Sequence, residues 1–378
     1  MYIGALAAVA LGFSVILSVW GTRNAWRMRN FPSLDSCKPP HSGPLVSVII
    51  PVRNQELSVG ACLESITKQD YPLTEVIVVD GQSTDRTVEI VRGFAATTLI
   101  REPSLPYGWV GKNWACHVGY LRSKGEYLLF TDGDVVLGKN TISAAMSEIL
   151  RFRCDLLSLW PRIIMNTFWE KLVLPLMFVA WFVEFGGRDV NSDERRWAAF
   201  GPFILARRSS YEDAGGHESV RQSTGEDYRL AQRFKEMHLA VRVMAGTGFV
   251  STRMYSTLAE IWHGFLKNEF ESFDYSAPPA ILASARQAAV YILPFLFFVP
   301  GILLAPNLST ALILSLPCLT MTVVMVVLYR TMGYDAKYAV LSAVAAAIYL
   351  GIRAHSIYLG VTAKGVEWKG RVYEQSRL

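Results

Sequence analysis

Two carboxylates, Asp132 and Asp134, flank Gly133 directly after a strand-like run at residues 126–131. Carboxylates one residue apart at the end of a strand can face the same ligand-filled crevice across a flexible glycine. Hard cations such as Mg²⁺ and Mn²⁺ favour oxygen ligands and usually share them with phosphates. Most Asp-x-Asp triplets lie in surface turns, so the prediction of a divalent-cation site depends on the residues around this one.

Other polar residues follow strand-like runs elsewhere in the first third of the chain. Buried-strand runs alternate with helical segments, which predicts a parallel sheet covered on both faces. Ligands bind at the carboxyl ends of the strands in such sheets. We therefore expect the polar residues after these strands to form one site. The strand runs are 46–50, 75–79 and 127–130, the helical segments include 86–94 and 113–121, and the polar ends are 51–54, Asp80-Gly81 and 132–134.

A second acidic pair, Glu226-Asp227, follows Gly225 at the start of a predicted helix. The helix macrodipole favours acidic residues in a first turn, which is a purely structural explanation. A carboxylate that accepts a proton during catalysis is the functional alternative.

The composition is unusually apolar, with 51% hydrophobic residues, 18% charged residues and a mean hydropathy of +0.26. Three uncharged runs account for the excess: residues 3–20, 287–329 and 338–352. The first is long enough for a membrane anchor, and the second for two crossings of a hydrocarbon core about 30 Å thick, with a turn at Pro306-Asn307. The third is marginal in length and is cut short by Arg353 and His355, so we expect a re-entrant or interfacial segment.

Charge and cysteine usage indicate the compartment and the partners. Arg23, Arg27 and Arg29 follow the first apolar run, which places the N-terminus outside and the next domain in the cytoplasm, at the plasma (inner) membrane. The five cysteines include no Cys-x-x-Cys pair, which argues against a zinc site or a disulfide framework. The net charge of +5 comes without a basic stripe of interleaved aromatics, so nucleic-acid binding is not expected.

These patterns divide the chain into four parts. We expect an N-terminal transmembrane anchor at residues 1–30 and a cytoplasmic catalytic domain at 45–270. Interfacial helices are expected near residues 168–185 and 258–270. C-terminal membrane helices at 285–360 and a basic tail at 361–378 complete the expected organisation.

The polar residues taken together resemble the family 2 glycosyltransferases of the GT-A fold, over residues 46–270. Four further segments resemble the membrane glycosyltransferases that act on hopanoids and carotenoid acids. The chain departs from that pattern at Gln55, where those relatives commonly carry Glu. The resemblance implies a Rossmann-like mixed, mainly parallel α/β sheet with N-terminal and C-terminal transmembrane helices. The four segments are 108–115, 201–206, 211–218 and 368–373.

The resemblance also implies a role for each site residue. Asp80 would bind the base or ribose of a nucleotide sugar. Asp132 and Asp134 would hold Mn²⁺ or Mg²⁺ against its diphosphate, and Lys112 would add positive charge there. Asp227 would be the general base, with Glu226 shaping the acceptor site. The donor-binding residues are Pro51, Arg53, Asn54, Glu56, Asp80, Lys112, Asp132 and Gly133.

The predicted reaction is transfer of a hexose from a UDP-linked sugar to an acceptor that is a membrane lipid of isoprenoid-like character. Metal and cations stabilise the diphosphate leaving group, and one base on the opposite face implies inversion. A processive polysaccharide synthase is the alternative enzyme, although no Gln-x-x-Arg-Trp follows Asp227. A non-catalytic nucleotide-sugar-binding scaffold is the alternative outside enzymes. A transporter is disfavoured because residues 287–329 contain no Asp, Glu, Lys, Arg or His that could mark a substrate path.

Overall fold

The computed structural model describes residues 2–35, 43–184, 190–303, 305–362, 364–368 and 371–373. Their contacts divide the chain into two units. Residues 31–164 and 188–254 form one, here called the sheet unit. Residues 1–30, 165–187 and 255–378 form the other, the helical unit. The segments near 168–185 and 258–270 thus group with the apolar helices by their contacts.

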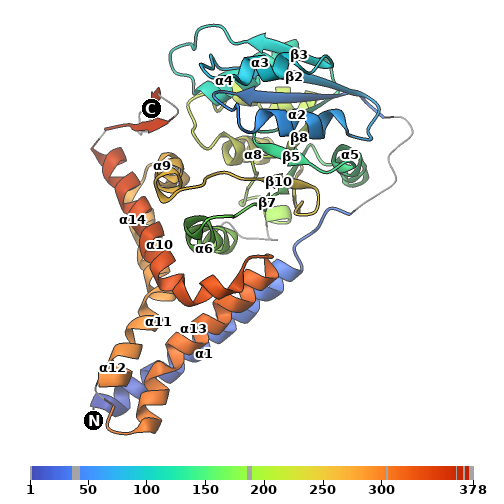
Figure 1. The fold of residues 1–378 in the computed structure, drawn as a ribbon. Helices are drawn as coiled ribbons and strands as arrows, with labels where there is room; N and C mark the ends of the chain where they lie inside the picture. Colours follow the sequence, from blue (N-terminus) through green and yellow to red (C-terminus); the bar gives the residue numbers. More distant parts are fainter. Residues whose placement is uncertain are drawn as a thin grey trace. The chain divides into compact units, whose positions relative to one another are not determined.

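The sheet unit is built on seven strands in the order β3-β2-β1-β4-β8-β6-β9 (Figure 1). All neighbouring strands pair in parallel except β8, which is antiparallel to both β4 and β6. The expected mixed, mainly parallel sheet is confirmed. The strands are β1 (Val46–Val52), β2 (Thr74–Asp80), β3 (Thr97–Arg101), β4 (Tyr127–Phe130), β6 (Leu156–Trp160), β8 (Ile204–Arg207) and β9 (Val241–Ala245).

Helices cover both faces of this sheet, and a small three-stranded sheet flanks it (Figure 1). The helices are α2 (Val59–Thr67), α3 (Thr87–Arg92), α4 (Gly111–Arg122), α5 (Thr141–Phe152), α7 (Arg208–Asp213), η2 (Gly216–Glu218) and α8 (Glu226–Glu236). The small sheet has the order β5-β10-β7, from Val135–Leu137, Val250–Thr252 and Arg162–Ile163.

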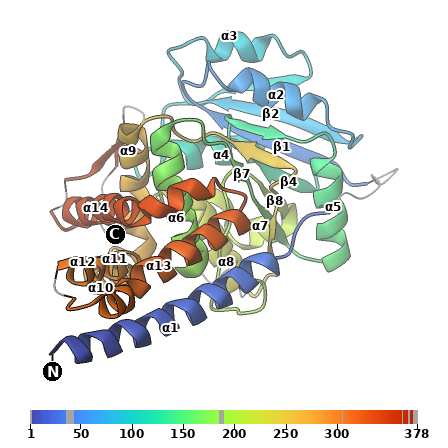
Figure 2. The same cartoon turned by 60° about the horizontal axis from the view of Figure 1, so that its bottom comes forward.

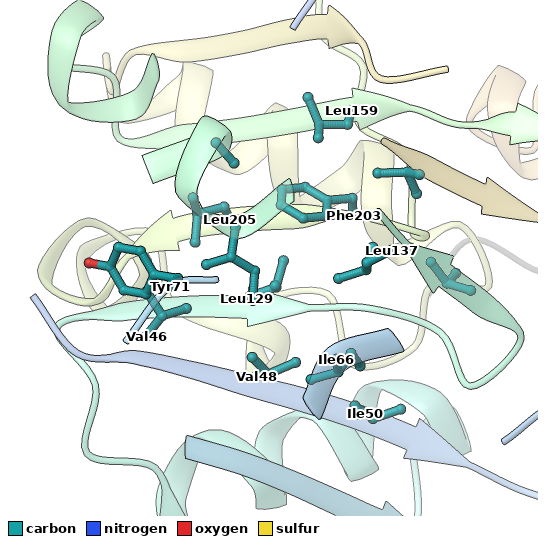
Figure 3. Packing of buried hydrophobic residues seen from close by; sticks show 14 of the residues in the cluster. Val46, Val48, Ile50, Ile66, Tyr71, Leu129, Leu137, Leu159, Phe203 and Leu205 are labelled. Atoms are coloured by element: carbon teal, nitrogen blue, oxygen red, sulfur yellow. The ribbon is translucent and has the colours of Figure 1, made fainter. Parts of the chain in front are cut away.

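The core lies on both faces because side chains alternate along each strand. Val48 and Ile50 of β1 pack with Leu129 and Leu205 on one face, as Figure 3 shows, whereas Ile49 belongs to the cluster on the other face. Strands buried on both sides read as continuous apolar runs, which is why β1, β2 and β4 were predictable from the sequence.

The chain that follows the first helix closes one edge of the sheet. Leu34 donates its N–H to the carbonyl of Ala245 at 2.9 Å, and Ala245 donates to the carbonyl of Pro32 at 2.7 Å. Ser33 forms a parallel bridge with the same residue of β9. An edge strand covered in this way presents fewer unpaired backbone groups to other chains.

The helical unit is mainly helix, and α1 lies alongside α13 in both views of the molecule (Figure 2). Its helices are α1 (Tyr2–Arg29), α6 (Phe168–Glu184), α9 (Leu258–Glu269), η3 (Glu271–Phe273), α10 (Ala277–Tyr291), α11 (Leu293–Leu296), α12 (Phe298–Leu303), α13 (Leu308–Thr331), η4 (Ala336–Leu341) and α14 (Ser342–Val361). A hairpin of β11 (Val366–Trp368) and β12 (Arg371–Tyr373) follows.

Three helical stretches are long and apolar enough to cross a membrane: Gly4–Arg29, Leu308–Thr331 and Ala336–Val361. The turn expected at Asn307 is present, because its side chain caps α13 by accepting the Thr310 N–H at 3.0 Å. The run before it is not a single helix. Pro294 begins α11 and cannot continue the hydrogen bonding of α10, so that stretch divides into α10, α11 and α12.

Helix α14 continues past Arg353 to Val361, within the stretch Ala336–Val361 that is long and apolar enough to cross a membrane. The expected re-entrant or interfacial position of residues 338–352 stays a prediction. Arg353 is 1% exposed, and the Nε and Nη2 atoms of its guanidinium both have partners. Its Nε lies 2.9 Å from Glu269 Oε2, and its Nη2 donates to Tyr349 Oη at 2.6 Å. Glu184 lies 3.7 Å from the same guanidinium and 2.7 Å from Arg286. A buried charge is tolerated when it is paired in this way.

Helices α1 and α13 approach closely at a glycine. A Cβ built on Gly21 would lie 2.5 Å from Cγ2 of Val324, so no larger residue fits there without separating the helices. By contrast, nothing lies within 4 Å of a Cβ built on Gly12 of the same helix. Small residues at such crossings let apolar helices pack backbone to backbone.

Candidate active site

Lys112, in the first turn of α4, brings together two of the acidic segments predicted from the sequence. Its Nζ lies 2.6 Å from Asp132 Oδ1, after β4, and 2.7 Å from Glu226 Oε1, at the start of α8. Burial lowers the pKa of Lys112, but Asp132 and Glu226 outweigh that effect and hold it well above its usual value. The ammonium is therefore a permanent positive charge between two carboxylates.

Asp227 is held next to this pair by two backbone donors. Its Oδ2 accepts the N–H of Gly201 at 2.9 Å, and its Oδ1 accepts the N–H of Tyr228 at 2.8 Å. Burial and the neighbouring Glu226 raise the pKa of Asp227 to about 6, against the opposing effect of Lys112. A carboxylate with a raised pKa is suited to take a proton near neutral pH.

Gly201 is the point where these groups converge. A Cβ built there would lie 3.0 Å from Lys112 Nζ, 3.3 Å from Asp132 Oδ2 and 3.6 Å from Asp227 Oδ2. The residue must be small for the three charged groups to meet. Sequence reasoning included this segment in the resemblance but gave Gly201 no role, because a lone glycine gives no signal of long-range proximity.

Asn113, a residue that sequence reasoning missed, fastens the loop that precedes Glu226 to α4. The buried Asn113 amide donates to the carbonyls of Val220 at 2.8 Å and Ser223 at 2.9 Å. Val110 donates its N–H to the carbonyl of Arg221 at 2.7 Å. These bonds tie residues 220–223 to the helix that carries Lys112.

The end of β2 presents a buried carboxylate. Asp80 is 1% exposed, and its Oδ1 accepts the N–H of Ser83 at 3.1 Å. Within the part of the chain that the structure describes, its Oδ2 has no hydrogen-bond partner, and Arg101 Nε lies 4.0 Å from it. Arg53 donates from Nη1 to the carbonyl of Gly81, the residue that follows Asp80, at 2.5 Å. A buried acceptor without a partner is suited to bind a donor group of a ligand.

Asn54 and Glu56, expected at the nucleotide pocket, bind the loop after β2. Asn54 has a positive φ of 50° and accepts the Thr84 N–H at 2.8 Å through Oδ1. Glu56 Oε2 accepts the N–H of Arg86 at 3.1 Å. Pro51 lies inside β1, opposite Val79, because the strand continues to Val52. These residues join the ends of β1 and β2.

Gly133 and Asp134 complete the acidic turn after β4. A Cβ on Gly133 would lie 2.9 Å from Val52 Cγ1 and 3.3 Å from Gln55 Oε1, so the turn packs tightly against the end of β1. Burial, followed by the negative charges of Asp134 and Asp132, raises the pKa of Cys62 to about 12. The Sγ of Cys62 lies 3.6 Å from the backbone carbonyl oxygen of Asp132, so this buried thiol packs against the acidic turn.

Asp132 and Asp134 are the two carboxylates that the sequence predicts to bind a divalent cation. Among the residues that the structure describes, no group of three or more His, Cys, Asp or Glu side chains is arranged to hold a metal ion. Mg²⁺ is usually bound by one or two carboxylates together with phosphate oxygens and water. The oxygen donors of Asp132 and Asp134 fit such an ion if a diphosphate supplies the remaining ligands.

Comparison with known proteins defines the class. Residues 47–215 match the family model described as glycosyl transferase family 2. The 4,4'-diaponeurosporenoate glycosyltransferase of Staphylococcus aureus (strain USA300) is 31% identical over 225 residues, which cover 57% of this chain. The match spans 59% of that relative's own length.

A solved structure supports the fold. The mannosyltransferase PcManGT from Pyrobaculum calidifontis, in complex with GDP-Man and Mn²⁺, aligns with a TM-score of 0.52 and 18% identity. The alignment covers 95% of this chain and 98% of that one.

Residues 47–215 therefore match glycosyl transferase family 2, and the chain shares its fold with this solved structure, which supports the expected GT-A fold. The resemblance predicted from the sequence is confirmed, as is the expected enzyme class of this domain, glycosyltransferase.

Proposed function

We propose that this protein is a membrane-bound inverting glycosyltransferase. It transfers a hexose from a nucleotide sugar, expected to be UDP-linked, to a lipid acceptor of isoprenoid-like character. The observation that carries this proposal is the carboxylate of Asp227. It is fixed by two backbone N–H groups, has a raised pKa, and lies beside the Lys112–Asp132 pair.

Donor binding is assigned to the carboxyl ends of β1, β2 and β4. The buried Asp80 accepts a hydrogen bond from the base or ribose, and Arg53 stands next to it in the pocket. Asp132 and Asp134 would hold Mn²⁺ or Mg²⁺, which would supply positive charge to stabilise the diphosphate leaving group. Lys112 adds a fixed positive charge on the same side.

The chemical step is assigned to Asp227. An acceptor hydroxyl is a poor nucleophile, and Asp227 takes its proton as it attacks the anomeric carbon. The two backbone donors orient the carboxylate without neutralising it. Glu226 keeps the pKa of Asp227 raised and shapes the acceptor side. One base facing one leaving group gives a single displacement with inversion, from an α-linked donor to a β-glycoside.

The acceptor is inferred from the helical unit and from the relative. Three helices long and apolar enough to span a membrane support a membrane-embedded substrate. The relative is named for 4,4'-diaponeurosporenoate, an elongated carotenoid acid, which supports an isoprenoid-like acceptor. The arginines after residue 20 favour a sheet unit in the cytoplasm, at the plasma (inner) membrane.

The test is release of nucleoside diphosphate by the detergent-purified protein, with Mn²⁺, a panel of nucleotide sugars and a total membrane lipid extract. Mass spectrometry of the lipids runs in parallel. We expect lipid-dependent release and a lipid that gains a single hexose mass. A ladder of added hexoses would instead favour the polysaccharide synthase. Donor binding without release across lipids from several sources would favour the non-catalytic scaffold.

A further inference from the structure

The acidic cluster of the active site already contains a cation, the ammonium of Lys112. It lies between Asp132 Oδ1, at 2.6 Å, and Glu226 Oε1, at 2.7 Å. The side chains of Lys112 and Asp132 are 32% and 26% exposed, so both face the open side of the cluster. Glu226 is 8% exposed and is the deeper partner.

A divalent ion that coordinates Asp132 must approach the oxygens that Lys112 now engages. A Mg²⁺–oxygen bond is about 2.0–2.1 Å long, so an ion on Oδ1 would lie within about 5 Å of the ammonium from any direction. The second oxygen, Oδ2, faces the crowded point at Gly201, where Asp227 also converges. Two positive ions so close together repel strongly in a partly buried site.

From this geometry we propose that Lys112 forms an ion pair with Asp132 in the donor-free enzyme. When the donor binds, this ion pair breaks and Asp132 binds the divalent ion instead. Lys112 keeps its contact with Glu226 and exchanges Asp132 for a phosphate oxygen of the donor. This proposal rests on the proposed function and adds an exchange of partners to it. Lys112 is thus a donor-binding residue that pairs with Asp132 when the donor is absent and with the donor phosphate when it is present.

The exchange couples the binding of metal and nucleotide. Without nucleotide, an ion that takes Asp132 leaves Lys112 with one partner fewer, so metal binding is weakened. With nucleotide, the diphosphate supplies the replacement partner, so metal binding is strengthened. By linkage, the metal must then strengthen nucleotide binding by the same factor. The enzyme would bind the metal–nucleotide pair in preference to either component alone.

The test measures Mn²⁺ affinity by electron paramagnetic resonance of the free ion, with and without UDP or GDP. The variants are Lys112→Met and the double variant Lys112→Met/Glu226→Gln. The double variant removes one positive and one negative charge together, so long-range attraction for the ion is unchanged. The single variant leaves Asp132 and Glu226 without their shared counter-charge, which can impair folding. The double variant leaves only Asp132 in that state, so it keeps the test valid if the single variant folds poorly. Lys124→Met, at an exposed lysine of the same unit, is the control.

We expect both Lys112 variants to bind Mn²⁺ roughly fivefold or more tightly without nucleotide, and to lose most of the tightening that the nucleotide gives the wild type. Lys124→Met should behave as wild type. Unchanged or weaker Mn²⁺ binding by the double variant, or full nucleotide coupling in it, would overturn the exchange. If the wild type transfers sugar but the Mn²⁺ affinity of the double variant equals that of the wild type, the exchange is refuted and the proposed function stands. Failure of transfer by the wild type would refute the proposed function.

Discussion

At the scale of single residues, Asp227 carries the assignment of the reaction. Changing Asp227 to Asn keeps the shape of the side chain and one of its two backbone contacts, because the amide oxygen can accept only one of the two N–H groups. The substitution removes the proton acceptor. We expect transfer to fall by about 10²–10⁴-fold, the usual contribution of a general base, with nucleotide-sugar binding retained. The measurement is the transfer rate together with donor binding by calorimetry. Asp213→Asn, at an exposed position of α7, is the control. A variant that keeps more than about a tenth of the rate would remove Asp227 from the role of base.

The raised pKa of Asp227 predicts how activity depends on pH. The base works in its deprotonated form, so kcat/KM should fall as the pH drops below about 6. Glu226 contributes to the raised pKa, after burial, through its negative charge. Glu226→Gln should therefore lower the pKa of Asp227 and move the fall in kcat/KM to lower pH. The pH profiles of the two proteins, compared in one buffer series, test this, and a shift to higher pH would contradict it.

At the scale of elements, the contact between α1 and α13 depends on Gly21. We expect Gly21→Leu to destabilise the helical unit by about 1–3 kcal/mol, since the added side chain meets Val324. Gly12→Leu is a matched control on the same helix, because a Cβ there meets nothing within 4 Å. The readout is the melting temperature in one detergent. Equal losses for the two variants would show that the effect comes from α1 alone and not from this crossing.

The ion pairs around Arg353 link α14 to α9 and α6. Arg353→Met leaves Glu269 and Glu184 without their central cation, and removal of one member of a buried pair typically costs about 3–5 kcal/mol. We expect a clear drop in melting temperature, and little change in Arg330→Met, which loses an exposed arginine at the end of α13.

A second substitution separates this pairing from packing. Glu269→Gln in the Arg353→Met background removes one of the two stranded carboxylates, so part of the lost stability should return. The loss of stability that Glu269→Gln causes in the wild type is the reference. If Glu269→Gln causes the same loss in the Arg353→Met background, the two residues do not interact energetically.

At the scale of the whole molecule, the sequence was sufficient to predict the doubly covered sheet, because strands buried on both faces are continuous apolar runs. It did not predict β8, whose antiparallel direction depends on partners far along the chain. Local patterns carry no information on such pairings.

The candidate site was predictable only in part, for the same reason. Asp132 follows a strand and Glu226 begins a helix, so local patterns in the sequence single out both, and the family resemblance named Lys112 before the contacts were known. Gly201 and Asn113 could not, because their importance comes from contacts with distant segments. The continuation of α14 past Arg353 was missed because the partners of that charge, Glu269 and Glu184, lie on other helices.

The closure of the sheet edge by residues 32–34 also sets an order of events during synthesis. Ser33 and Ala245, which pair there, are 212 residues apart, and the first of them leaves the ribosome directly after the apolar helix. At about 5–20 residues per second, its partner follows roughly 10–40 s later. The segment next to α1 must remain unpaired throughout that interval. The first segment of the sheet unit to be synthesised, residues 32–34, is therefore the last to pair with the seven-stranded sheet, because its partner β9 is the last strand of that sheet in the sequence.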